Sequence, residues 1–367
     1  SLPDAPRAAD AAYTAILAHA QLEAAQDPAP AALQRRRIAA ELRFQANFPG
    51  DERANEVLAH AANQLLQLAD YPAAVAAAST LVGLSPAPRA ELRIPAWLVM
   101  GHSYFALEDY LQAEIAYREG LALLAAADTR REAATQRLAA AIYRQGEADA
   151  AAGRHDSAAA HFRRAMVAAP ASRVRMSAQY DAATALMQAG ELQQANTLLQ
   201  DFRRRYPQHE LTAGIGATLV QNYEALQDWQ SAAGELDTLR AGQDDPDAAR
   251  RYLLGAARYY DAAGDTDRAI ARYRSYAHDW PQPLDDNLEA VHRLTELYAA
   301  SGASDKRRYW LERTMAIHDE AGAAQSGRSA YLAAQAASLL GDERFDAFRR
   351  ERLTLPLART LPRKQAT

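Results

Sequence analysis

Residues 94–120 read IPAWLVMGHSYFALEDYLQAEIAYREG, and this stretch decides the fold. Two segments with helix-forming residues flank Glu108-Asp109-Tyr110, where an acidic pair can end one helix and cap the next. Two helices joined by so short a turn must approach closely where they cross, and a small residue such as Gly101 permits this. Large residues such as Trp97 and Tyr117 then fill the space between one helical pair and the next. The stretch therefore predicts a helical hairpin.

The same arrangement returns along the chain with a fixed period. Pro49 and Pro86 are 37 residues apart, as are Pro170 and Pro207, and each proline marks a place where a helix ends. Small residues follow the same period, at Ala158, Ala195, Ala232 and Ala269. A period in this range is typical of solenoid proteins. The spacing lengthens to 45 between Ala113 and Ala158, which predicts an insertion around 128–131 that extends a helix or loop.

Each period also carries a turn signal between its two helices. The signal is a glycine or an acidic residue, often followed by an aromatic, as in Ala69-Asp70-Tyr71, Glu108-Asp109-Tyr110, Ala189-Gly190-Glu191, Gln227-Asp228-Trp229 and Ala263-Gly264-Asp265. Glycine can adopt the left-handed conformation that ends a helix, and aspartate can cap the next one. Small, aromatic and proline positions in this order resemble the tetratricopeptide repeat (TPR) pattern. The resemblance implies an all-α, right-handed TPR superhelix of about eight helix-turn-helix units.

The ends depart from the repeat pattern, as the terminal repeats of a solenoid do. We expect capping helices in residues 1–54, seven TPR-like units in 55–321 and a degenerate unit with an extended tail in 322–367. The first region should hold helices over 8–25 and 31–47, with Arg35-Arg36-Arg37 on a solvated face. In the last region Gly341-Asp342 predicts an eighth turn, and the prolines after 355 predict the extended tail. This tail resembles an inter-repeat segment of long periplasmic TPR proteins, which implies that the chain is a piece of a longer array.

Composition and motifs argue against several classes of function. The net charge is −5 and the basic residues are scattered, so we expect no nucleic-acid partner. The chain has no cysteine and no apolar run of about 18 residues, which excludes thiol chemistry and predicts no transmembrane segment. Its nine histidines form no i,i+4 pair, and acidic residues such as Asp244-Asp245 flank prolines, where turns and helix caps use them. We therefore expect no catalytic residue, no metal and no cofactor.

A binding surface can be placed by geometry, because the first helices of successive units line the concave side of such a solenoid. The candidates form an apolar and aromatic strip followed by a charged one: Leu98, His102, Phe105, Tyr143, Tyr180, Thr184 and Met187, then Gln221, Glu224, Arg251, Arg258, Asp261, His292 and Glu296. We expect Tyr143, Tyr180 and Met187 to anchor a partner and Arg251 and Arg258 to orient an acidic portion of it. The alternative is that these aromatic residues pack against neighbouring helices and that the charged ones are ordinary surface.

Units that close with Tyr-Pro or Trp-Pro, as at Tyr206-Pro207 and Trp280-Pro281, are similar to those of TPR proteins of the bacterial envelope. Examples are the TPR lipoprotein of the outer-membrane β-barrel assembly machine and the TPR protein that works with the Tol-Pal system. The resemblance implies a periplasmic, non-catalytic scaffold that binds other proteins or peptide segments of an envelope assembly, with an export signal or lipid anchor ahead of Ser1 in the complete gene. Two alternatives stay open: a cytoplasmic TPR adaptor, and the superhelical portion of an enzyme such as a lytic transglycosylase.

Overall fold

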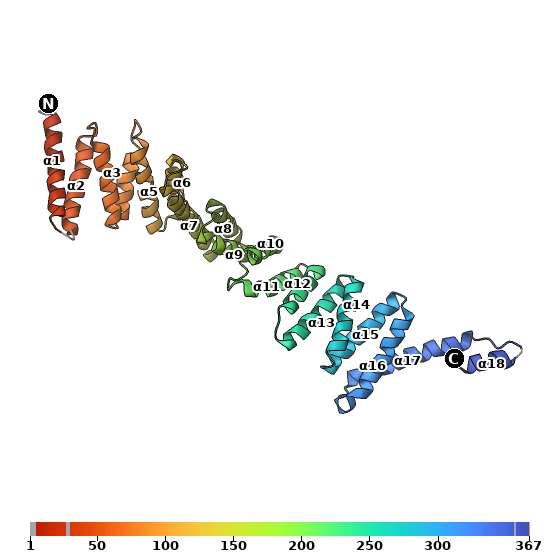
Figure 1. Ribbon diagram of the computed structural model, residues 1–367. Helices are drawn as coiled ribbons and strands as arrows, with labels where there is room; N and C mark the ends of the chain where they lie inside the picture. Colours follow the sequence, from red (N-terminus) through yellow and green to blue (C-terminus); the bar gives the residue numbers. More distant parts are fainter. Residues whose placement is uncertain (1–4, 27–29, 356, 367) are drawn as a thin grey trace. The chain divides into compact units, whose positions relative to one another are not determined.

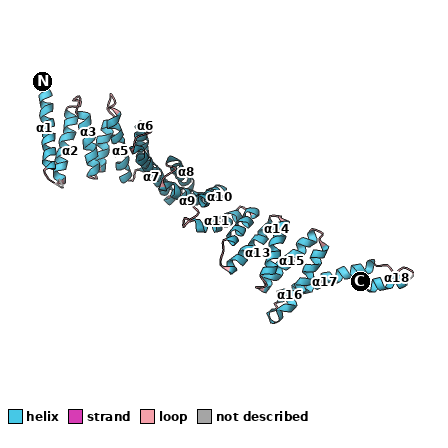
Figure 2. Cartoon of the chain, in the orientation of Figure 1, coloured by secondary structure: helices cyan, strands magenta, loops and turns pink. Residues whose placement is uncertain are grey.

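The computed structural model describes residues 5–26, 30–355 and 357–366 (Figure 1). Throughout these residues the chain forms helices and the turns between them, without a strand (Figure 2). It divides into two compact units, one ending at Arg205 and the other beginning at Tyr206. The all-α prediction is confirmed.

The amino-terminal unit contains ten helices. They are α1 (Ala5–Ala24), α2 (Ala31–Asn47), α3 (Ala54–Gln67), α4 (Tyr71–Val82), α5 (Ala90–Ala106), α6 (Tyr110–Leu123), α7 (Arg130–Ala151), α8 (His155–Ala168), α9 (Arg173–Gln188) and α10 (Leu192–Arg205). From α3 onward, each odd-numbered helix is the first of a hairpin and each even-numbered helix is the second. The insertion predicted before Ala158 lengthens a helix, since α7 has 22 residues whereas α5 has 17.

The carboxy-terminal unit continues the same succession. Its elements are α11 (Thr212–Ala225), α12 (Trp229–Ala241), α13 (Pro246–Ala262), α14 (Thr266–Asp279), α15 (Leu284–Ala300), α16 (Ser304–Ala321), the 3₁₀ turn η1 (Gly322–Ala324), α17 (Gly327–Arg350) and α18 (Leu357–Gln365). Among the described residues of both units, extensive contacts join helices that are one or two places apart in the chain. Each hairpin is therefore stabilised by its neighbours.

The turn inside each hairpin places one residue in the left-handed region of backbone space. This residue is Ala69, Glu108, Gly153, Gly190, Gln227, Gly264 or Gly302, with φ between 55° and 82°. An aspartate follows at four of these turns, and its side chain accepts a hydrogen bond from the third amide of the next helix, as Asp228 does from Ser231 at 3.1 Å. The predicted signals that end one helix and begin the next therefore occupy adjacent residues of the same turn.

Three of these turns carry a side chain where glycine would be unstrained, which gives a direct test. We expect Gln227→Gly to raise the free energy of unfolding by about 0.5–1 kcal/mol, because glycine adopts a positive φ without a steric penalty. Gly264→Ala should lower it by about 1 kcal/mol. The same Gln→Gly change at Gln221, an exposed position inside α11, should be destabilising by about 0.5–1 kcal/mol. Urea unfolding followed by circular dichroism measures all three, and a stabilising Gln221→Gly would contradict this explanation of the turns.

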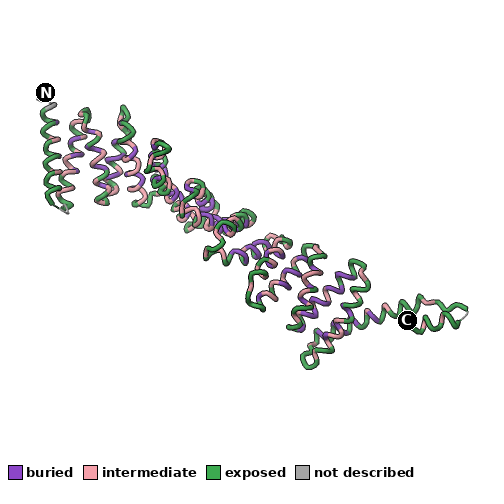
Figure 3. Tube along the Cα trace, in the orientation of Figure 1, coloured by how far each residue is buried: buried purple, intermediate pink, exposed green. Residues whose placement is uncertain are grey.

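Small residues are needed at the helix crossings because the two helices of a hairpin approach each other closely there. A Cβ atom added to Gly101 would lie 2.7 Å from the ring of Tyr117, and one added to Gly146 would lie 2.7 Å from the ring of Phe162. Both rings are buried in the second helix of their hairpin. The buried residues of α3–α16 form a core between the helices of each unit, whereas the end of α17 and all of α18 are mostly exposed (Figure 3).

The predicted turn at Gly341-Asp342 is wrong, because α17 continues through it. Glycine also tolerates helical backbone angles, and the apolar face that includes Ala336 and Leu340 packs on Leu311 of α16. Beyond the glycine, Glu343 pairs with Arg307 of α16 at 2.9 Å. Contacts with α16 therefore hold the helix together past a residue that could have ended it.

Two further expectations about the ends are corrected. The described tail is helical rather than extended: Lys364 Nζ donates to the Glu351 carbonyl at 3.1 Å and lies 4.4 Å from the centre of the Phe348 ring, so α18 folds back against α17.

Arg37, near the other end of the chain, is not on a solvated face. Its guanidinium pairs with Glu23 of α1 at 3.3 Å and with the buried Glu41 at 3.0 Å, and thereby joins α1 to α2.

Candidate functional site

All fourteen candidate residues lie on the first helices of hairpins. Leu98, His102 and Phe105 are on α5, Tyr143 on α7, Tyr180, Thr184 and Met187 on α9, Gln221 and Glu224 on α11, Arg251, Arg258 and Asp261 on α13, and His292 and Glu296 on α15. The exposed ones are Gln221, Arg251, Arg258 and Glu296, and the others are partly buried. Their role in binding stays a prediction, although several of them line pockets or take part in polar contacts between hairpins.

Tyr143 and Thr184 line one pocket of about 320 Å³ in the amino-terminal unit, where α7 and α9 lie side by side over α8. The buried ring of Phe162, which α8 supplies, lies 5.2 Å from the Tyr143 ring between centroids. The remaining lining residues are Glu147, Ala150, His155, Asp181, Ala185 and Gln188. The pocket thus combines an aromatic floor with two carboxylates.

A hydrogen bond between neighbouring hairpins organises this pocket. The Tyr143 hydroxyl donates to Asp181 Oδ2 at 2.6 Å, which ties α7 to α9. Burial raises the pKa of the Asp181 carboxyl, and the nearby charge of Glu147 acts in the same direction. Burial and the bond to Asp181 also raise the pKa of Tyr143 well above its usual range, so its proton stays in this bond at neutral pH.

His102 and Phe105 line a second pocket, of about 420 Å³, together with residues of α3, α4, α6 and α7. The ring nitrogen Nδ1 of His102 lies 2.7 Å from the hydroxyl of Tyr117, a fully buried residue. Burial, assisted by the charge of Arg137, lowers the pKa of His102, so its neutral form is favoured. This pocket presents a neutral imidazole and an aromatic ring beside one guanidinium.

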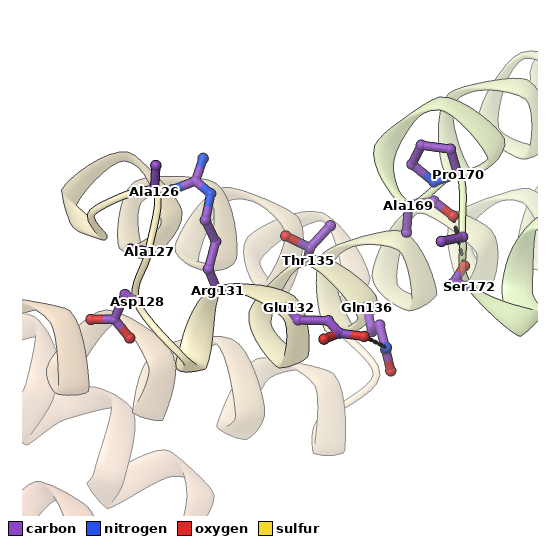
Figure 4. A pocket seen from close by; sticks show the side chains of 11 residues that line it. Ala126, Ala127, Asp128, Arg131, Glu132, Thr135, Gln136, Ala169, Pro170 and Ser172 are labelled. Carbon is purple, nitrogen blue, oxygen red and sulfur yellow. Dashed lines mark hydrogen bonds between the residues drawn. The ribbon is translucent and has the colours of Figure 1, made fainter.

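A third pocket, of about 580 Å³, lies at the connections between repeats rather than among the predicted residues (Figure 4). Alanines and a proline from two loops line it beside the start of α7. Several of its polar groups are already bonded within the chain: Arg131 donates to the carbonyls of Leu121 and Leu124, and Gln136 donates to Glu132. The pocket therefore offers mainly apolar surface and little chemistry.

In the carboxy-terminal unit, polar contacts link the candidate residues across successive first helices. Tyr259 of α13 donates to Glu224 of α11, and burial together with this bond raises the pKa of Tyr259 to about 12. Arg293 of α15 binds Asp261 at 2.5 Å and Glu296 at 2.5 Å. Much of the predicted charged strip is thus paired within the protein, while Arg251 and Arg258 remain exposed.

Sequence reasoning missed the residues that complete these surfaces, above all Asp181, Glu147 and Phe162 in the α7–α9 pocket. One signal was available: Tyr143 and Asp181 are 38 residues apart, which is close to one repeat, so they occupy similar places on adjacent first helices. Glu224 and Tyr259, at a spacing of 35, show the same relation. A donor and an acceptor one repeat apart indicate a bond between neighbouring hairpins.

Two kinds of feature are absent from the described residues. No group of three or more histidine, aspartate or glutamate side chains among them could hold a metal ion. Of the described helices, none combines the length and the apolar character needed to cross a membrane.

The geometry defines an all-α solenoid built from helical hairpins, and comparison with protein families gives these hairpins a name. The tetratricopeptide repeat family model matches residues 177–209 and 251–283. The first segment covers most of α9 and all of α10, and the second covers most of α13 and all of α14. These two hairpins therefore match the tetratricopeptide repeat pattern.

Several solved structures resemble the chain at low identity. A TPR protein from Parabacteroides merdae is 16% identical, with 70% of this chain and 89% of that one covered and a TM-score of 0.27. The carboxy-terminal part of a TPR protein from Cytophaga hutchinsonii is 13% identical, with 75% and 98% covered and a TM-score of 0.30. BtubC (BKLC) from P. vanneervenii is 20% identical, with 66% and 92% covered and a TM-score of 0.27. No curated protein matches the sequence significantly.

Tetratricopeptide repeats bind other proteins or peptides, and the fold is generally non-catalytic. The repeat fold thus suggests a protein-interaction scaffold.

Proposed function

We propose that this chain is a non-catalytic scaffold that binds other proteins along the first-helix faces of its repeats, as part of a bacterial cell-envelope assembly. The observation that carries the binding role is the α7–α9 pocket, where neighbouring first helices leave a recess lined by Tyr143, Phe162 and two carboxylates. Recesses with aromatic walls and a few placed polar groups are the usual places where a partner's side chain inserts.

The location in the envelope rests on different grounds. It is supported by the resemblance of the Tyr206-Pro207 and Trp280-Pro281 endings to those of envelope TPR proteins and by the absence of cysteine, which suits an oxidising periplasm. Fusion of alkaline phosphatase to the full-length reading frame tests the location. We expect an active reporter, whereas an inactive fusion that stays intact in the cytosol would favour the cytoplasmic adaptor.

Binding along the first helices is tested by placing a photo-cross-linking residue, p-benzoylphenylalanine, at Gln188 in cells of the bacterium that encodes the protein. Gln188 is an exposed lining residue at the end of α9, so the added rings lie at the edge of the pocket and leave the recess open. The matched control is Val167 on the second helix α8, which is 79% exposed. We expect a specific cross-linked protein from position 188 and none from position 167.

Affinity for the protein so identified supplies the quantitative measurement. Thr184→Trp should fill the pocket and weaken binding at least about tenfold, mainly through faster dissociation, whereas Val167→Trp should leave affinity within about twofold. The larger aromatic residues are poorer choices, because Tyr143 packs on Phe162 and Tyr180 on Phe202, and truncating them would also disturb the hairpin. If only the α8 variants alter binding, the first-helix faces are not the binding surface.

A further inference from the structure

The α7–α9 pocket contains one carboxylate, that of Asp181, that makes no ion pair within the described residues. Glu147, Asp181 and His155 line the pocket, and no lysine or arginine is among its lining residues. In the described part of the chain, Asp181 accepts a hydrogen bond from the neutral Tyr143 hydroxyl and makes no ion pair. Glu147 binds Arg144 at 2.9 Å through Oε2, which leaves its Oε1 for another donor. Asp181 therefore differs from Asp261, which Arg293 neutralises.

We propose that this pocket binds the side chain of an arginine presented by an extended segment of a partner protein; the inference rests on the proposed scaffold function and names the partner's chemistry. The guanidinium would lie against the Tyr143 ring and donate hydrogen bonds to the carboxylates of Asp181 and Glu147.

Three properties of the pocket match an arginine. Aromatic rings attract a cation placed over their faces, and Tyr143 and Phe162 form the floor. A guanidinium has five N–H donors in a plane, so one group can reach two carboxylates while it stacks on a ring. A cation would also relieve the burial and the like charge that raise the pKa of Asp181.

An acidic or a purely apolar side chain fits less well. A carboxylate would add a negative charge beside the unpaired carboxylate of Asp181. An apolar side chain would cover Asp181 without supplying a donor, and burying an unpaired carboxylate is costly. The aromatic floor alone would accept an apolar or a cationic side chain. The carboxylates make the cationic side chain the better ligand.

The probes are two blocked five-residue peptides, each with four alanines around a central residue that is arginine in one and citrulline in the other. Citrulline keeps the shape and loses the charge. Titration into the full chain with methyl-labelled threonine follows the Thr184 signal at the pocket, with the signal of Thr218 on α11 as the remote reference. We expect millimolar binding of the arginine peptide and about tenfold weaker binding of the citrulline peptide.

Two variants distinguish binding in the pocket from attraction of the peptide by negative charge elsewhere on the protein. Asp181→Asn keeps an acceptor for the Tyr143 hydroxyl and should reduce affinity for the arginine peptide about tenfold, without changing that for the citrulline peptide. Asp156→Asn removes the same charge from an exposed position at the start of α8, outside the pocket lining, and should change affinity less than about twofold. Thermal unfolding verifies that both variants fold as the parent does.

The inference is overturned if neither peptide binds, if both bind equally, or if Asp181→Asn and Asp156→Asn act alike. These outcomes are distinguishable from a failure of the proposed function. Cross-linking from position 188 in cells together with equal binding of both peptides would leave the scaffold role intact and remove only the preference for arginine. Absence of cross-linking from position 188 would count against the scaffold role itself.

Discussion

Replacing Tyr117 by alanine should lower the free energy of unfolding of the amino-terminal unit by about 3–5 kcal/mol. The Tyr117 side chain is 0% exposed, its hydroxyl lies 2.7 Å from His102 Nδ1, and its ring fills the space that Gly101 leaves open. Alanine would leave a cavity between α5 and α6 that the helices cannot close, because each is also packed against the next hairpin. For a unit of this size the melting temperature should fall by roughly 10 °C.

The control for this prediction is the same substitution at an exposed tyrosine. Tyr331 on α17 is 58% exposed, so Tyr331→Ala should change stability by less than about 0.5 kcal/mol. Thermal and urea unfolding, both followed by circular dichroism, measure the two variants. Equal effects at the two positions would mean that the α5–α6 crossing does not support the unit as described.

The second large effect concerns Glu114, a carboxylate that is only 3% exposed on α6. Arg118 donates to it at 2.5 Å, Gln145 of α7 at 2.7 Å, and Arg164 of α8 also pairs with it, so three helices meet at one buried charge. Replacing Arg118 and Arg164 by methionine together should lower the free energy of unfolding by about 3–5 kcal/mol, because Glu114 would then be a buried charge without a counter-ion.

Adding Glu114→Met to that double variant supplies the decisive comparison. With no charge left to bury, the triple variant should recover most of the lost stability, since replacing a buried ionic cluster by apolar residues of similar volume is often close to neutral. Urea unfolding of the parent, the double and the triple variant completes the cycle. A triple variant no more stable than the double one would show that the arginines act through packing of their aliphatic stems.

Local sequence signals predicted most of the hairpins. Aspartates after a helix end, as at Asp109 and Asp228, act through bonds to amides three residues away, and such contacts depend little on the rest of the fold. The same reasoning was wrong at Gly341-Asp342, where the local residues also permit a helix and contacts with α16 hold it together. Arg37 was misplaced for a similar reason, because its partner Glu23 lies on another helix.

The amino-acid sequence by itself determined the helical hairpin, its period and the helices that carry the candidate residues. These follow from backbone preferences and from small and large residues at fixed spacing, which are properties of short segments. Only the tertiary structure decided that Asp181 bonds to the Tyr143 hydroxyl and makes no ion pair among the described residues, whereas Arg293 neutralises Asp261. The physical reason is that the rotation of each helix about its axis and the lateral distance to its neighbour arise from side-chain packing between hairpins. A change of about one residue in register, or 100°, would turn these charges to another face.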